Sequence, residues 1–288
     1  MNFLLNKNLN YSKTLFHASK FLLIGSLFVV LFSGIDCAWN QGQGPIYLNN
    51  IIKNVWEEEI NETDSTKKLK DYMEFFGLEK QYYSFNYGNV HFTAISTELP
   101  YEEGSEQYEF VNNDLSKVLS DPDIDWIVVF FHSLAYTSPA DIGKGNRAEK
   151  EFRATYHPLF DKYNVDIVLQ AHNHNYQRTY PIIFNNDKPK EPIVTDKTDN
   201  NNYNFHNPEG QIFVTAGTGG AELYPLTGQA DFIANQYVGF GFLDVDVINN
   251  NNEMTTTLAG KFYANYDVVD DNETTIKDQF TITKTVKS

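Results

Sequence analysis

The sequence contains one cysteine, Cys37, and few basic residues for its length. A single cysteine cannot form an intrachain disulfide, so stability must come from an apolar core, and 288 residues are enough to bury one. Lys and Arg number 22 against 38 Asp and Glu, which gives a formal net charge of −16 at pH 7. This acidic balance excludes nucleic acids and anionic membranes as expected partners.

Long hydrophobic runs are also missing. The apolar run at residues 21–35 is shorter than the roughly 20 residues that a membrane-spanning helix needs. It follows a stretch that carries Lys7, Lys13 and Lys20 without an acid, and small residues lead from it to Ala38. This order is typical of a secretory signal peptide. We therefore expect residues 1–37 to be a signal peptide and the chain to be secreted or extracytoplasmic, with an uncleaved membrane anchor as the alternative.

Aromatic residues are plentiful: 18 Tyr and 22 Phe are enough to pack two sheets face to face. Residues 239–247 and 254–264 are predicted to form a hairpin across an Asn-rich turn, and residues 279–283 a last edge strand. Asp244 and Asp246 alternate with apolar residues in the hairpin, which favours a half-solvated strand over a metal site. The polar stretch 184–210 is interpreted as a surface excursion, and residues 45–288 as one domain.

Histidines follow two short apolar runs. Residues 165–171 lead into His172 and His174, and residues 125–131 lead into His132. Residues 146–163 between the runs have apolar positions at helical spacing, so the segment is predicted to be a strand, a helix and a second strand. The right-handed crossover of such a unit makes its strands parallel and brings their carboxyl ends to one edge. The three imidazoles should converge there, at the edge where open α/β sheets bind ligands.

Four segments together resemble the calcineurin-like metallophosphoesterases, in the branch similar to purple acid phosphatases. They are residues 82–92, 126–136, 166–178 and 211–220, in the family's order. The resemblance implies an α/β fold, a two-sheet sandwich flanked by helices, and a binuclear centre of iron and/or zinc that hydrolyses small phosphate esters. It also implies that His132 and His172 bind the second metal and that His174 binds the first.

The chain departs from the family pattern in its first half. Ala171 stands where the family has Gly, and residues 1–131 lack the family's first-strand Asp, its Gly-Asp-x-x-Tyr motif and its Gly-Asn-His turn. Gly88 to His91 mimics that turn, but it lies in an alternating stretch, residues 83–92, which we interpret as one strand. His91 is therefore taken as a sheet residue, and the fold is expected to be incomplete at its N-terminal half.

The missing carboxylates limit the expected activity. Three neutral imidazoles should hold one metal cation, unless an acid such as Asp141 or Glu222 completes a second site. No catalytic residue is assigned beyond the metal ligands, since Lys144 and Arg147 are interpreted as solvated loop charges. The expected function is a weak or inactive acid phosphatase-like hydrolase. The alternatives are an inactive metal-binding or interaction module, and a half-site that requires a complementing chain.

Overall fold

The structure is a computed structural model that describes residues 73, 77–139, 150–197, 203–219, 222–250, 254–265 and 275–285, together with the backbone of residues 30–33. Most of the predicted signal peptide lies outside these residues. So does the loop that contains Asp141, Lys144 and Arg147. None of the helices in the described residues is long and apolar enough to cross a membrane.

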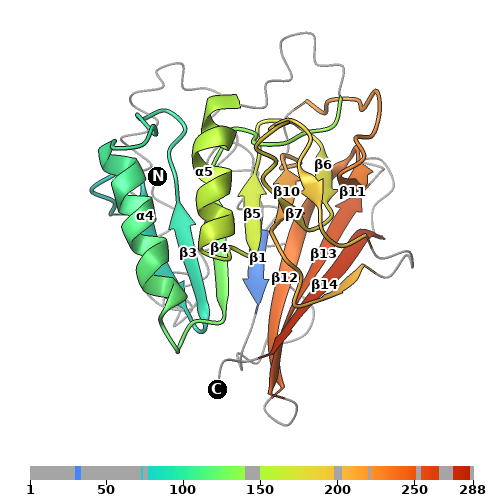
Figure 1. The fold of residues 1–288 in the computed structure, drawn as a ribbon. Coiled ribbons are helices and arrows are strands. Elements are labelled where there is room, and N and C mark those ends of the chain that lie inside the picture. The colour runs from blue at the N-terminus through green and yellow to red at the C-terminus, as the bar shows by residue number, and fades with distance from the viewer. Residues whose placement is uncertain are drawn as a thin grey trace, which may run out of the picture.

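A seven-stranded mixed sheet lies at the centre of the fold (Figure 1). In spatial order its strands are β11 (Ile233–Tyr237), β6 (Tyr176–Thr179), β10 (Ile212–Ala216), β5 (Ile167–Gln170), β4 (Trp126–Phe130), β3 (Val90–Ala94) and β2 (Tyr83–Tyr87). The adjacent strands β10, β5, β4 and β3 run parallel to one another. Every residue of β3, β4, β5 and β10 is buried, as expected for parallel strands covered on both faces.

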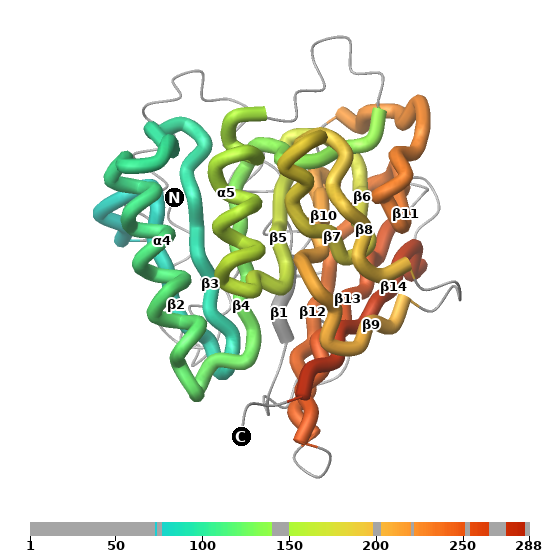
Figure 2. Tube along the Cα trace, viewed as in Figure 1, coloured from blue at the N-terminus to red at the C-terminus, as the bar shows by residue number. Residues whose placement is uncertain are grey.

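Two helices cover one face of this sheet. Helix α4 (Glu106–Leu119) begins after Ser105, whose side chain accepts a hydrogen bond from the backbone N–H of Tyr108. Helix α5 (Lys150–Lys162) lies between β4 and β5 in the sequence, and Figure 2 shows the helix beside these two strands. Both helices bury an apolar stripe in a core that includes side chains of β4, β5 and β10. The strand, helix and strand predicted around the histidines are confirmed.

A second sheet packs on the other face of the first. Its five strands, in spatial order, are β1 (Val30–Ser33), β12 (Phe240–Asn250), β13 (Thr255–Asn265), β14 (Thr275–Thr285) and β9 (Asn204–His206). The core between the sheets contains aromatic and branched side chains from both. A two-stranded sheet of β7 (Ile182–Ile183) and β8 (Ile193–Val194) contributes Ile182 to the other core, under the helices. The predicted architecture of two sheets flanked by helices is therefore observed.

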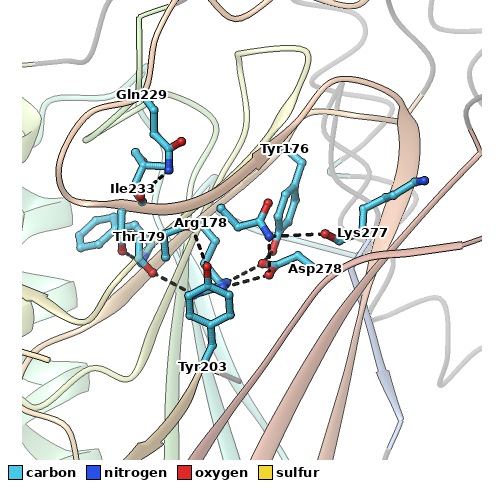
Figure 3. A network of polar contacts seen from close by, with 11 residues as sticks. Tyr176, Arg178, Thr179, Tyr203, Gln229, Ile233, Lys277 and Asp278 are labelled. Atoms are coloured by element: carbon cyan, nitrogen blue, oxygen red, sulfur yellow. Dashed lines mark hydrogen bonds and ion pairs between the residues drawn. The ribbon is translucent and has the colours of Figure 1, made fainter. Parts of the chain in front are cut away.

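A buried ion pair joins the two sheets (Figure 3). Arg178 on β6 donates to both carboxylate oxygens of Asp278 on β14, at 2.6 and 2.9 Å. The Tyr176 hydroxyl and the Asn235 amide also donate to this carboxylate, at 2.7 and 3.0 Å. With four donors around it, Asp278 fixes the position of β6 against the second sheet.

Three local predictions need correction. Residues 83–92 form a hairpin of β2 and β3 rather than one strand, because Gly88 has a φ of 56° that a two-residue turn can use. Strand β14 is not an edge, since the short strand β9 pairs with its other side. Strand β9 comes from the stretch 184–210, whose Phe205 is buried, so this stretch is not purely a surface excursion. The predicted hairpin of β12 and β13 is confirmed.

Strand β1 comes from the apolar run of the predicted signal peptide. Its backbone pairs in parallel with β12, with Val30 opposite Leu243 and Ser33 opposite Asp246. Cleavage near Ala38 would remove this pairing and make β12 an edge strand of the second sheet. Strand β12 would keep its full-length pairing with β13.

Candidate functional site

The site lies where β4 and β5 end. These strands are parallel, so their carboxyl ends reach the same edge of the sheet. His132 follows β4 after one residue, and His172 follows β5 after one residue. The backbone N–H of Ala171 donates to the carbonyl of His132 at 3.1 Å, which extends the strand pairing into the two loops. The sheet itself therefore brings two histidines 40 residues apart in sequence together.

His132 and His172 face each other. Nε2 of His132 lies 3.3 Å from Nδ1 of His172. Their rings are nearly perpendicular, at 89°, with centroids 5.4 Å apart. Burial, together with the nearby His172 and His174, lowers the pKa of His132 to about 4. The neutral imidazole is the form that binds metals.

His172 has an unusual backbone conformation. Its φ is 52°, in the left-handed region that residues other than glycine seldom adopt. The backbone N–H of Asn173 donates to the carbonyl of Ala171 at 2.5 Å, so His172 is the central residue of a three-residue turn. Such strained backbone conformations persist only where the surrounding structure holds them, and they occur frequently at functional sites.

His174 is held by a third loop. Its Nδ1 donates to the carbonyl of Glu222 at 2.5 Å, and the Tyr224 ring stacks on the imidazole with centroids 4.1 Å apart. The Tyr224 N–H also donates to the carbonyl of His174 at 2.9 Å. Burial is the main cause that lowers the pKa of His174. A hydrogen bond from one ring nitrogen to a carbonyl is the usual way in which proteins orient a metal-binding imidazole through the other nitrogen.

As candidate ligands, the three imidazoles would serve one cation better than two. The facing nitrogens of His132 and His172, and Nε2 of His174, are imidazole nitrogens, a donor type that suits zinc or iron. Within the described residues, no group of three or more His, Cys, Asp or Glu side chains already has a metal-binding arrangement. Two adjacent cations would repel each other without a carboxylate between them.

Comparisons with known proteins were made by sequence and by structure. No model of a known protein family matches the chain. The chain is 31% identical over 177 residues to "Probable inactive purple acid phosphatase 1" of Arabidopsis thaliana, in a match that covers 60% of this chain and 27% of that protein. A purple acid phosphatase, PPD1, from yellow lupin (Lupinus luteus) seeds matches the structure with a TM-score of 0.57 at 28% identity, over 72% of this chain and 33% of that one.

Several relatives of this chain are named purple acid phosphatases, and some of these are named as probably inactive. Another relative, a nucleotide pyrophosphatase/phosphodiesterase of Hordeum vulgare, is 32% identical over 148 residues, which cover 51% of this chain and 38% of that protein. The chain thus spans between about a quarter and two fifths of the length of these curated relatives. It has the mixed α/β fold of the lupin purple acid phosphatase over the matched part.

Other candidate residues lie elsewhere or have other contacts. The Glu222 side chain is exposed, and it is the backbone carbonyl of this residue that contacts the site. His91 lies in β3 as a sheet residue and contacts Asp114. Asp244 and Asp246 are half-buried positions of β12. Asp141, Lys144 and Arg147 lie outside the described residues, so their predicted roles stay predictions.

Sequence patterns did not reveal the residues that hold the loops. Gln170, Asn173 and Gln177 are buried polar residues whose side chains bond to the loop after β4. Tyr224 lies far along the chain from His174, in a loop without regular structure. One signal was available: four carboxamide residues, Gln170, Asn173, Asn175 and Gln177, lie beside or between His172 and His174 in the sequence, and buried amides need partners.

Proposed function

We propose that this chain binds one metal cation through His132, His172 and His174 and takes small phosphate esters at that cation. The observation that carries the proposal is the 3.3 Å approach of two imidazole nitrogens, one from His132 and one from His172, at the shared carboxyl end of β4 and β5. A bound cation would supply charge that attracts phosphate oxygens and would activate water. Zinc and iron are the proposed metals because imidazole suits both.

The chain's own residues would orient this cation but would not provide the rest of a purple acid phosphatase site. Glu222 and Tyr224 orient His174, and the strained turn orients His172. The carboxylate motifs of the family are missing from the sequence before His132. We therefore propose that hydrolysis by the isolated chain is weak or absent.

A second candidate function is an inactive module that binds metal or a partner. Relatives named "probable inactive" purple acid phosphatases favour it, because they have this part of the sequence as well. A complementing chain that supplies the missing carboxylates is the other proposal. Addition of a fragment bearing those motifs should then raise turnover.

We further propose that residues 1–37 direct export of the chain. The basic start and apolar run support this proposal. N-terminal sequencing of the protein recovered outside the host cell tests it. A start near Ala38 is expected, whereas a membrane-bound product that keeps Lys7 would favour the anchor.

Hydrolysis of 4-nitrophenyl phosphate with added zinc and iron tests the main proposal. Loss of several ligands from a cooperating site removes several orders of magnitude in turnover, so we expect the wild-type rate to lie near background. The control is the double variant His172→Ala/His174→Ala. Robust wild-type turnover that disappears in this variant would overturn the weak-hydrolase proposal in favour of a complete enzyme.

A further inference from the structure

Two loops carry the histidines, and buried carboxamides join them. The first histidine loop is residues 131–139, and the second is residues 171–175. Gln170 and Gln177 flank the second loop, at the end of β5 and within β6. Both side chains are almost completely buried, with 1% exposure each. A buried carboxamide requires partners for its oxygen and its amino group.

Gln177 has partners in both loops. Its Oε1 accepts from the backbone N–H of Ser138 at 2.6 Å. Its Nε2 donates to Thr137 Oγ1 at 3.1 Å and to Asn175 Oδ1 at 2.9 Å. One planar group thus contacts Thr137 and Ser138 in the first loop and Asn175 in the second.

Thr137 is the point where these bonds meet. Its hydroxyl oxygen also accepts from Asn173 Nδ2 at 2.8 Å, and Asn173 lies between His172 and His174. The contacts therefore run from the residue between the two histidines, through Thr137, to Gln177. Gln170 binds the first loop closer to His132, at the backbone of Ala135 and Tyr136.

The strand direction explains why Gln177 points to these loops. Its neighbours in β6, Tyr176 and Arg178, both bond to Asp278 in the second sheet. Side chains alternate along a strand, so Gln177 points to the opposite face of the first sheet. The ion pair fixes the strand on one face while Gln177 reaches the loops on the other.

We propose that Gln177 is a positioning residue that sets the separation between His132 and the His172–His174 pair, and thereby the affinity for the cation. This inference rests on the proposed metal-binding function. Residues that orient metal ligands without touching the metal commonly change the affinity by about tenfold or more when they are replaced. A purely structural glutamine would change stability without changing the affinity.

Gln211 provides the matched control. It is also 1% exposed, and its Nε2 donates to Asp161 Oδ1 at 3.1 Å. It immediately precedes β10, whose Ile212 pairs with Ile167 at the start of β5. Gln211 therefore lies at the opposite end of the strands from the histidine loops.

The test compares Gln177→Leu with Gln211→Leu in the full chain. Zinc affinity is measured by competition with a chromophoric chelator, and Tm is measured without metal. Both variants should have a lower Tm than the wild type, because each loses a buried hydrogen bond. Only Gln177→Leu should weaken zinc binding, by about tenfold or more. Equal zinc affinities in the two variants would overturn the proposal.

If Gln177→Leu does not fold, Gln177→Glu takes its place in the zinc-affinity comparison. The glutamate can still accept from Ser138 but cannot donate to Thr137 and Asn175, so its zinc affinity should also be lower than that of the wild type. Wild-type affinity in Gln177→Glu would contradict the proposed role. Thr137→Val should weaken zinc binding as well, because it removes the shared oxygen.

Failure of the metal-binding function would be recognised separately. If His132→Ala/His172→Ala binds zinc as the wild type does, or the wild type binds none, the proposed function fails. The positioning role is then decided without metal, from ¹H–¹⁵N spectra of the imidazole rings. Gln177→Glu should shift the His132 and His172 signals and Gln211→Leu should not; unchanged His132 and His172 signals in Gln177→Glu would overturn the role.

Discussion

Gly217 allows two backbone segments to approach closely beside the histidines. A Cβ atom at this position would lie 2.0 Å from the carbonyl oxygen of Asn173 and 3.4 Å from the Cα of His174. The Gly217 N–H also donates to the carbonyl of Asn175 at 3.2 Å. The second histidine loop therefore rests directly on the backbone that follows β10.

We predict that Gly217→Ala displaces this loop. The added methyl group overlaps a backbone atom that cannot rotate away, so the variant should lose on the order of 2 kcal/mol of stability. Zinc affinity should fall as well, because a shift of the Asn173 backbone would also move the adjacent His172 and His174. Gly228→Ala is the control, since its Cβ would lie 3.7 Å from the nearest atom, in the Pro139 ring. Wild-type zinc affinity and Tm in Gly217→Ala would contradict this account of the loop.

A second residue-scale prediction concerns Asp114 on α4. Its carboxylate accepts hydrogen bonds from Ser84 at 2.7 Å and Thr93 at 2.8 Å, and it lies 3.0 Å from Nε2 of His91. Burial acts to raise the pKa of Asp114, but the bonds from His91, Ser84 and Thr93 outweigh burial and lower the pKa below its ordinary 3.8. The carboxylate therefore stabilises the folded chain above that pH, and this contribution is lost as the pH falls through the folded-state pKa.

Asp114→Asn should remove this contribution. Urea denaturation at a series of pH values should show the largest loss of stability near neutral pH and a shrinking difference from the wild type in acid. Asp123→Asn replaces an exposed carboxylate and should give a small difference at every pH. A constant difference for Asp114→Asn across the whole series would show that the charge of Asp114 does not contribute.

At the residue scale, the sequence predicted that His132 and His172 lie close together, but it did not predict the residues that hold the histidine loops in place. His132 and His172 could be placed because apolar runs and helical spacing define a parallel unit, whose geometry fixes where the strand ends meet. Gly217, Gln177 and Tyr224 could not, because their contacts depend on the packing of distant loops. The strained φ of His172 likewise follows from tertiary contacts and leaves no pattern in the sequence.

At the scale of elements, the ion pair between β6 and β14 connects β6, the strand that follows the second histidine loop, to the second sheet. Asp278→Ala would leave Arg178 as an uncompensated buried charge, which should cost on the order of 3 to 5 kcal/mol. The double variant Arg178→Met/Asp278→Ala should recover part of this loss, because the buried charge is gone. Chemical denaturation of both variants measures the difference.

The exposed pair of Lys188 and Glu191 is the control for this experiment. Its Nζ to Oε2 distance is 3.1 Å, and both side chains are largely exposed. Glu191→Ala should therefore change the stability by less than about 1 kcal/mol. A double variant at Arg178 and Asp278 that is no more stable than Asp278→Ala would contradict the interpretation of Asp278 as the partner of a buried charge.

Strand pairing was predictable between strands that are close in sequence, and it was missed between strands that are far apart in sequence. The hairpin of β12 and β13 follows from alternation around an Asn-rich turn. Strand β9 has three residues and pairs in parallel with β14, about 75 residues away in sequence, so no pattern could place it. The turn at Gly88 was missed because alternation continues on both sides of a two-residue turn.

At the scale of the whole molecule, two large sheets, the small sheet of β7 and β8, and two helices make up the described fold without a disulfide. Core clusters lie on both faces of the seven-stranded sheet, one between the sheets and one under α4 and α5. This arrangement holds the histidine loops at the carboxyl edge of the sheet. The net charge of −16 disfavours an anionic ligand elsewhere on the surface, so a phosphate ester would depend on a cation bound at this edge.

The most direct test of this account is the number of metal ions held by each chain. Purified protein is dialysed against zinc or iron, and the bound metal is counted by mass spectrometry for the wild type and for His132→Ala/His172→Ala. The account predicts about one tightly held ion in the wild type and a clear loss in the double variant, because the three imidazoles serve one cation. Two tightly held ions per chain, or equal metal content in the wild type and the variant, would contradict it.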